Sequence, residues 1–505
     1  MRIVNKVMEI MMRSRLKAIE QSIKQPFITQ LNVLLSNIET AKNTIYGKEF
    51  GFDEIKNIEQ FQQRVPLVTY EDFEPYIELA RKGEKDVTWQ GKIRWFAKSS
   101  GTTNAKSKFI PISKESLEDC HYSAGKSMFA LYLNAYPETE IFLHKNLRIG
   151  GSSELYRHYQ TQFGDLSAIL IENLPFYAEL KNIPNKEISL MADWNLKMDA
   201  IIQATKNEDV GSLTGVPSWM LVVLNKMLTD TNSTYIDELW PNIEVFFHGG
   251  VSFKPYEENY RNITKKQLNF FEIYNASEGF FAIQDQLDKK ELLLLLDNGI
   301  FYEFIEMENF GQENPKCLTI DQVEIGKNYA LVISTNGGLW RYIIGDTVRF
   351  TSTSPHRIVI TGRTKHHINV FGEELMIENA EEALKLACEK TNAMVAEYSA
   401  APVYMVGKEK GAHEWVIEFS RDPTDLETFI DELDRGLQSV NSDYEAKRYN
   451  NMTLNRPLIH KARKGLFIDW MKRRGKLGGQ NKIPRLSNTR EYIEPLIALN
   501  QSQEK

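Results

Sequence analysis

The first 85 residues carry apolar side chains at helical spacing and few strand signals. The stretch FITQLNVLLSNIETAKNTIYG (27–47) predicts a helix with Gly47 as its C-cap. The opening MRIVNKVMEIMMRSRLKAIEQS predicts an amphipathic helix, because charged residues such as Lys6 and Glu9 interrupt the apolar run that an export signal needs. We therefore expect residues 1–85 to form an opening helical segment.

The next pattern consists of two apolar runs, IRWFAK and KFIPIS, on either side of a hydroxyl-rich loop. Ser113 then precedes an acidic first turn and an apolar stripe, which predicts a helix over about 113–136. From about 140 to 250, short apolar runs such as IEVFFHGG alternate with helical stretches such as SWMLVVLNKMLTDT. This alternation predicts an α/β body.

Turn residues predict two hairpins in the following segment. Asp297-Asn298-Gly299 separates two strand-like runs in ELLLLLDNGIFYEFIEM, and Gly337-Gly338 does the same in the next such stretch. Beyond residue 363 the pattern changes to a helix, a strand pair (APVYMVG and EWVIEFS) and a helix over about 424–439. We therefore place a domain boundary near residue 363 and expect a compact α+β unit after it.

Composition narrows the class of protein. The chain has 505 residues, of which 42% are hydrophobic and 26% charged, as in an ordinary soluble protein of two to four domains. Its formal charge is −7 and its basic residues are scattered, so nucleic acid is not expected as a partner. Cys120, Cys317 and Cys388 lie far apart, which favours neither a zinc site nor a disulfide framework. With Leu292–Leu296 as the longest aliphatic run, we expect a cytoplasmic protein without a membrane partner. The oligomeric state cannot be read from the sequence.

The hydroxyl-rich loop, FAKSSGTTNAKSKFIPIS (96–113), suits an anion, because hydroxyl, ammonium and backbone N–H groups in a tight turn favour phosphate. It is not a Walker A loop, because Lys106 stands where the second glycine of that motif belongs. The alternative interpretation is a polar hairpin loop, since Ser, Thr, Asn and Gly are ordinary turn residues.

Four glycine-bearing or acidic turns follow apolar strand-like runs: the 99–103 loop, FFHGG up to Gly250, the turn at Glu278, and YIIGD up to Asp346. Loops at strand ends converge in open α/β sheets, so four such turns could line one site. Gly250 would admit a flat ring, Tyr274 could stack on it, Glu278 could hold Mg²⁺ and Asp346 could accept from a ribose diol. Each residue alone also suits a turn, a packed core position or a cap.

Six stretches carry a resemblance to a known family: SSGTTNAKSKFIP, HGGVSFKPY, YNASEGFFAIQ, LWRYIIGDTVRF, TGRTKHHINVFGEEL and GGQNKIPRL. In their order and spacing, over residues 85–490, the chain resembles bacterial members of the auxin-responsive GH-three family of acyl-acid amido synthetases. That family is part of the acyl- and aryl-adenylate-forming superfamily. The resemblance implies an α/β fold with a large adenylating domain (1–363) and a small, mobile α+β domain (364–505), hinged at TGRTKHHIN.

The resemblance also implies a two-step ligase reaction. A carboxylate attacks the α-phosphorus of ATP to give an acyl-adenylate and pyrophosphate, and an amine, typically of an amino acid, then displaces AMP. ATP and Mg²⁺ would be the cofactors. Lys482 and Glu278 are implied as catalytic residues, and Glu278 also as the magnesium ligand. The implied nucleotide-binding residues are Ser99, Ser100, Gly101, Thr102, Thr103, Gly250, Val251, Tyr274, Ser277, Asp346 and Arg363.

Some alternatives stay open from the sequence. Asn104-Ala105 departs from the small residues common in the family's phosphate loop, so the backbone path near the terminal phosphates is not fixed. The adenylate could instead pass its acyl group to coenzyme A, or the chain could be a degenerate nucleotide-binding protein. Lys482 could be one solvated lysine in a basic stretch. Which acid and which amine react cannot be read from the sequence, and bacterial members of the family need not act on auxin or jasmonate.

Overall fold

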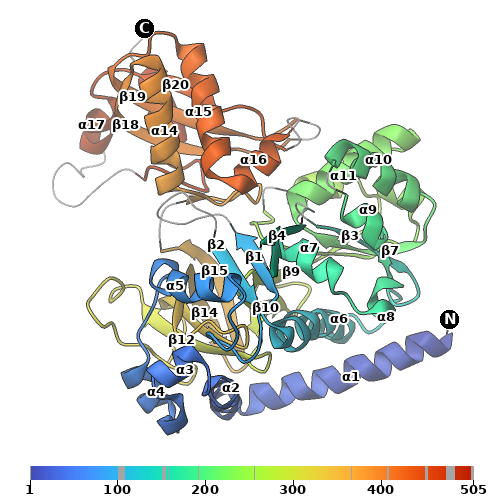
Figure 1. Ribbon diagram of the computed structural model, residues 1–505. Coiled ribbons are helices and arrows are strands. Elements are labelled where there is room, and N and C mark those ends of the chain that lie inside the picture. Colours follow the sequence, from blue (N-terminus) through green and yellow to red (C-terminus); the bar gives the residue numbers. More distant parts are fainter. Residues whose placement is uncertain are drawn as a thin grey trace.

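The computed structural model describes residues 2–99, 108–150, 155–158, 160–191, 193–254, 256–364, 367–406, 409–449, 453–473 and 484–501. Figure 1 shows a large N-terminal body (α1–β15) and a smaller C-terminal lobe (β16–α18, orange to red) above it. The mixed α/β architecture predicted from the sequence is confirmed. In the part of the chain described, no helix is long and apolar enough to cross a membrane.

The opening segment is helical, as predicted, but Gly47 does not end its second helix. That helix ends at Ala41, and Gly47 lies inside the next one, where Thr44 accepts a hydrogen bond from its N–H at 2.9 Å. A Cβ at Gly47 would collide with the Ala41 carbonyl, so the glycine serves a close contact. The helices are α1 (Arg2–Lys24), α2 (Pro26–Ala41), α3 (Ile45–Glu49), the 3₁₀ helix η1 (Phe52–Glu54), α4 (Ile58–Arg64) and α5 (Tyr70–Arg81).

The predicted strands around the hydroxyl-rich loop form an antiparallel pair with Ser99 opposite Lys108. They belong to a four-stranded sheet in the order β2-β1-β5-β4. The predicted helix after them begins as a π-helix, η2 (Ser116–Tyr122), and continues as α6 (Ser123–Ala135); Ser113 Oγ accepts from Ser116 N at 2.8 Å. The strands are β1 (Trp95–Ser99), β2 (Lys108–Ile112), β4 (Leu155–His158) and β5 (Thr161–Gly164).

An eleven-stranded sheet forms the centre of the body, in the order β12-β13-β14-β15-β11-β10-β9-β8-β7-β3-β6. Strands β9, β8, β7, β3 and β6 run parallel, and the remaining neighbours are antiparallel. The strands are β3 (Lys145–Ile149), β6 (Asn182–Ile183), β7 (Val210–Gly215), β8 (Val245–Gly249), β9 (Asn269–Ala276), β10 (Gly279–Gln284), β11 (Leu292–Leu294), β12 (Ile300–Glu306), β13 (Asn328–Thr335), β14 (Tyr342–Thr353) and β15 (His356–Arg363). Helices accompany the parallel half, as predicted: α7 (Leu166–Glu172), α8 (Phe176–Glu179), α9 (Lys186–Ser189), α10 (Trp194–Thr205), α11 (Pro217–Thr231), α12 (Ile236–Leu239) and α13 (Glu257–Asn262).

Of the two predicted hairpins, the one at Gly337-Gly338 is confirmed and the one at Asp297-Asn298-Gly299 is wrong. β13 and β14 pair antiparallel, whereas β11 pairs with β10 and β15, and β12 pairs with β13. The reason is Gln30 on α2, whose Nε2 donates to the carbonyls of Leu296 (2.8 Å) and Ile300 (2.9 Å). This side chain satisfies backbone groups that hairpin pairing would have used.

The C-terminal lobe has the predicted helix, strand pair and second helix. One buried hydrophobic cluster includes Trp219 and Tyr260 of the body together with Phe371 and Leu437 of the lobe. The two parts therefore share packed apolar surface in this orientation. The lobe contains β16 (His367–Ile368), β17 (Leu375–Met376), α14 (Ile377–Thr391), β18 (Met394–Val403), β19 (Ala412–Arg421), α15 (Leu426–Val440), α16 (Ser442–Arg448), β20 (Leu458–Ala462), α17 (Leu466–Arg473) and α18 (Ile493–Gln501).

Candidate functional site

The candidate site begins at the carboxyl ends of the parallel strands β8 and β9. Gly250 and Val251 follow β8, and Ser277 and Glu278 form the turn after β9. Because β8 and β9 are parallel neighbours, both turns lie at the same sheet edge. Loops at this edge are where α/β sheets collect ligands.

Gly249, the last residue of β8, permits this close approach of the two strand ends. A Cβ there would collide with the Ile273 carbonyl and lie 2.8 Å from Ile273 Cγ1. Gly250 has φ +82°, a conformation that favours glycine. The glycine pair therefore fixes the backbone path beside β9.

We expect Gly249→Ala to lower the free energy of unfolding by about 1–3 kcal/mol, because the strands must shift to admit the methyl group. Thermal unfolding measures this change. The matched control is Gly125→Ala in α6, where a Cβ meets nothing within 4 Å and alanine is the better helix former. Equal stability of the two variants would contradict the close-approach argument.

Three predicted site residues, Tyr274, Asp346 and Arg363, meet in the structure. Tyr274 OH donates to Asp346 Oδ2 at 2.5 Å, and Arg363 Nε lies 2.9 Å from Asp346 Oδ1. Strands β9 and β14 are separated in sheet order by β10, β11 and β15, which would place them about 19 Å apart in a flat sheet. The hydrogen bond therefore requires the antiparallel half of the sheet to curl towards β9.

Burial and charge set the protonation states in this group. Burial raises the pKa of Tyr274 well above its usual value, and the charge of Asp346 raises it further. Tyr274 thus remains a hydrogen-bond donor at neutral pH. Although burial alone would lower it, the pKa of Arg363 is raised because Glu374 and Asp346 hold the guanidinium charged. The group is a neutral phenol and a fixed cation around one carboxylate.

Glu278 lies in the electrostatic field of the same group. Burial raises the pKa of Glu278, whereas Lys108 lowers it. Lys108 opens β2 and its Nζ lies 3.5 Å from Tyr342 OH. Among the described residues no cluster of three or more His, Cys, Asp or Glu side chains could hold a metal ion. A single carboxylate still fits Mg²⁺ when substrate phosphates and water supply the other ligands.

Several predicted residues lie elsewhere or outside the described part of the chain. Ser99 ends β1, at one side of the hydroxyl-rich loop. Ser100, Gly101, Thr102, Thr103 and Lys482 fall outside the described residues. After Lys482 the chain is described again from Pro484, whose carbonyl accepts from Ser399 Oγ of β18 at 2.8 Å.

Sequence reasoning missed three residues that the structure adds to the group: Lys108, Glu374 and Asn369. Glu374 Oε1 accepts from an Arg363 amino group at 2.9 Å. Asn369 Nδ2 donates to the Gly250 carbonyl at 3.3 Å. All three stand in motifs that the sequence singled out, but nothing in the spacing shows that residues on both sides of the predicted hinge would contact each other.

Three family models match this chain in consecutive order. The GH3 family N-terminal domain matches residues 15–269, the GH3 family central domain 293–363, and the GH3 family C-terminal domain 378–491. The first alone covers half of the chain.

The chain belongs to the GH3 family. Among curated GH3 relatives, an indole-3-acetic acid-amido synthetase (GH3.3) of Arabidopsis thaliana is 21% identical, over 95% of this chain and 93% of its own length. A jasmonoyl-L-amino acid synthetase (GH3.5) of Oryza sativa is 25% identical, over 91% and 92%.

Solved structures show the same fold. A GH3 protein, the GH3.15 acyl acid amido synthetase in complex with 2,4-DB, is 19% identical over 96% of each chain, with a TM-score of 0.63. A 2-hydroxyisobutyryl-CoA ligase is 15% identical over 94% of this chain and 92% of its own, with a TM-score of 0.58. The fold is thus shared with an amide-forming and a thioester-forming ligase.

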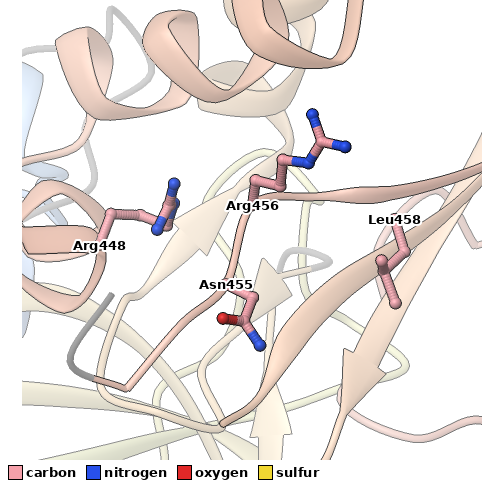
Figure 2. Close-up of a pocket in the computed structure, with 4 residues that line it drawn as sticks. All are labelled: Arg448, Asn455, Arg456 and Leu458. Carbon is pink, nitrogen blue, oxygen red and sulfur yellow. The ribbon is translucent and has the colours of Figure 1, made fainter. Parts of the chain in front are cut away.

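This GH3 chain also has a pocket of about 420 Å³ in the C-terminal lobe (Figure 2). Its two arginines already have carboxylate partners: Arg448 lies 2.6 Å from Asp434, and Arg456 lies 2.8 Å from Glu427. We assign it no ligand, because both cations are neutralised. The pocket is lined by Arg448, Asn455, Arg456 and Leu458.

The half-buried carboxyl group of Glu272 on β9 is expected to make the stability of this GH3 chain depend on pH. Burial raises the pKa of Glu272 to about 7, and the charge of Lys290 acts in the opposite direction. Because the folded state holds this proton more tightly than the unfolded chain, the contribution to stability is complete below about pH 4 and is lost as the pH rises through 7. We expect Glu272→Gln to flatten the fall in stability between pH 5 and 8. Denaturant unfolding across that range measures it, and an unchanged slope would contradict it.

Proposed function

We propose that this protein is an ATP-dependent acyl-acid amido synthetase that conjugates a carboxylic acid to an amine, most simply an amino acid. An oxygen of the acid attacks the α-phosphorus of ATP, the bond to pyrophosphate breaks, and an acyl-adenylate forms. The amine nitrogen then attacks the acyl carbon, the bond to the AMP oxygen breaks, and the amine loses its proton. The observation that carries this proposal is the meeting of Tyr274, Asp346 and Arg363 at the sheet edge of a GH3 chain.

In this proposal the nucleotide lies along the carboxyl ends of β8 and β9. Asp346 accepts from the ribose hydroxyls, with Tyr274 and Arg363 holding its carboxylate in place. Gly250 and Val251 border the adenine. Arg363 is held beside the proposed ribose position by its ion pairs with Asp346 and Glu374. Ser277, in the β9–β10 turn, would also contact the nucleotide. The phosphates would be bound by the loop of Ser99, Ser100, Gly101, Thr102 and Thr103.

Glu278 is the proposed magnesium ligand. Its turn lies at the same edge, and Arg363 and Lys108 stabilise its charged form. Mg²⁺ would neutralise charge on the triphosphate as pyrophosphate leaves. The first step brings two anions together, so positive charge must come from groups other than Arg363, whose guanidinium is already paired with Asp346 and Glu374.

Lys482 is the proposed catalytic lysine of the adenylation step, carried on the C-terminal lobe. We propose that residue 363 divides the chain into a nucleotide- and acid-binding domain and a domain that changes orientation at 361–369 between the two steps. We also infer a cytoplasmic enzyme related to bacterial members of the family. The curated relatives are named for indole-3-acetic acid and jasmonate, and the acid of this chain is to be identified by experiment.

A second candidate is an acyl-CoA ligase, because the same fold is found in a 2-hydroxyisobutyryl-CoA ligase. The test is acid-dependent exchange of labelled pyrophosphate into ATP across a panel of carboxylic acids, followed by mass spectrometry of products with amino acids or coenzyme A. An amino acid conjugate supports the amido synthetase, and a thioester supports the alternative. Exchange with no acid of a broad panel would contradict both.

A further inference from the structure

Arg148 is an unpaired cation near the carboxyl end of strand β3. Its Nε is enclosed without a hydrogen-bond partner, and its guanidinium forms no hydrogen bond or ion pair with a described residue. The terminal amino groups of this half-buried side chain are not enclosed and remain accessible to a ligand. Two other arginines with little exposure have carboxylate partners: Arg341 pairs with Glu303 at 3.0 Å, and Arg357 with Asp285 at 2.7 Å. Arg148 therefore lacks the counter-charge that such positions have elsewhere in the described part of the chain.

The strand register places Arg148 on the face of the central sheet that α6 covers. Arg148 lies opposite Thr214 of β7, and Thr214 lies opposite Phe247 of β8. The ring of Phe247 packs against Tyr132 of α6, with the ring centroids 5.4 Å apart. Because β3, β7 and β8 are parallel, Arg148 lies near the same sheet edge as the proposed nucleotide turns, two strands or about 10 Å from β8.

The helical segment η2 connects the surroundings of Arg148 with the proposed magnesium site. Tyr122, the last residue of η2, is close enough to Arg148 to act on its pKa. Two residues earlier, Cys120 Sγ accepts from Phe280 N at 3.3 Å, just after the turn at Glu278. An acid that places one end at the α-phosphorus beside this turn can therefore extend along η2 towards Arg148.

The burial of Arg148 favours a ligand that stays negatively charged throughout the reaction. Burial lowers the pKa of Arg148 to about 10, although Tyr122 and Glu179 act in the opposite direction. The guanidinium is therefore charged at neutral pH, and a buried charge without a partner is costly. The reacting carboxylate is a poor partner, because its charge disappears when the adenylate forms. A second carboxylate on the same acid keeps its charge through adenylation and acyl transfer.

We propose that Arg148 binds a second carboxylate of the acid, which makes a dicarboxylic acid the preferred substrate. This inference rests on the proposed acyl-adenylate function and names the class of acid that it uses. A guanidinium group can hold a carboxylate through two parallel N–H···O bonds, which also fixes the orientation of the acid. The carboxylate at the other end is then the one that attacks the α-phosphorus. The product is an amide at one end and retains one free carboxylate.

The test compares each dicarboxylic acid with its monoamide, which has nearly the same shape and lacks the second charge. Pyrophosphate exchange without amine is measured for the acids from succinic to suberic and for terephthalic acid, with full-length wild type and three variants. Arg148→Gln removes the charge and keeps a hydrogen-bond donor, whereas Arg148→Lys keeps the charge. The matched control Arg357→Gln removes a charge that Asp285 neutralises. Thermal unfolding should show Arg148→Gln to be at least as stable as wild type, because an unpaired buried charge is removed.

We expect the wild-type kcat/KM to be about tenfold to 100-fold higher for the best dicarboxylic acid than for its monoamide. Arg148→Gln should lose this preference through a higher KM for the dicarboxylic acid, with the monoamide changed about threefold at most. Arg148→Lys should keep part of the preference, and Arg357→Gln should keep all of it.

Three results would overturn the role of Arg148: no wild-type preference for the second carboxylate, a preference that survives in Arg148→Gln, or equal losses with both kinds of acid. Unchanged exchange together with a raised KM for the amino acid would also overturn it, and would assign Arg148 to the amine substrate. Exchange with no acid of either kind counts against the synthetase function itself. Normal exchange that ignores the second carboxylate counts against this inference alone.

Discussion

Replacing Asp346 with asparagine is expected to lower acid-dependent pyrophosphate exchange about 100-fold, because hydrogen bonds to a charged group each contribute about 1.5–3 kcal/mol. The asparagine is nearly isosteric, but its amide presents N–H donors where the carboxylate accepts from Tyr274 OH and Arg363 Nε. The proposed hydrogen bonds from the ribose hydroxyls also lose the negative charge of the carboxylate that accepts them. Exchange kinetics at varied ATP concentration measure the effect.

The matched control for this variant is Asp285→Asn. Asp285 forms an ion pair with Arg357 at 2.7 Å on the same sheet, and the two pairs are about equally buried. Both substitutions weaken a partly buried ion pair, so both should lower stability similarly. Exchange should fall in the Asp346 variant alone. A comparable fall in both variants would show that Asp346 acts through folding and not through the nucleotide.

The second large effect is expected at Glu278. Glu278→Gln keeps the size of the side chain and removes the charge of the proposed magnesium ligand, so the Mg²⁺ concentration for half-maximal exchange should rise about tenfold or more. At limiting Mg²⁺ the exchange rate should fall by the same factor, because the rate there is proportional to the fraction of enzyme that holds the ion. Titration of Mg²⁺ at saturating acid measures both quantities.

If the exchange rate of Glu278→Gln recovers at high Mg²⁺, the variant has lost a metal ligand and not its folded structure. The thermal stability of Glu278→Gln should equal or exceed that of wild type, because burial already disfavours the charged carboxylate. Unchanged Mg²⁺ dependence together with a lower rate would contradict the metal assignment and leave Glu278 an electrostatic role.

Local patterns in the sequence predicted elements well and predicted strand partners less well. The chain turns at Asp297-Asn298-Gly299 as expected, but β11 before the turn and β12 after it do not pair with each other. Pairing there depends on Gln30, which is 266 residues away from Leu296 in the chain. Gly47 is a similar case, because its small size serves a contact with Ala41 instead of a helix end. Neither contact has a local signal.

In the candidate site, too, local features could be predicted from the sequence and long-range contacts could not. Residue types and strand ends pointed to Tyr274, Asp346 and Arg363, and the structure brings these three together. Glu374 and Asn369 were missed because their roles arise from docking of the C-terminal lobe on the body. The boundary at residue 363 stays a prediction, since one hydrophobic cluster continues across both parts.

The most direct test of the account uses an acid labelled with ¹⁸O in both carboxylate oxygens, with ATP and an accepted amine. Attack on the α-phosphorus followed by amide formation leaves one carboxylate oxygen on the phosphate of AMP. The account predicts AMP carrying one ¹⁸O, together with unlabelled pyrophosphate. Label in inorganic phosphate with formation of ADP, or amide formation with unlabelled AMP, would contradict it.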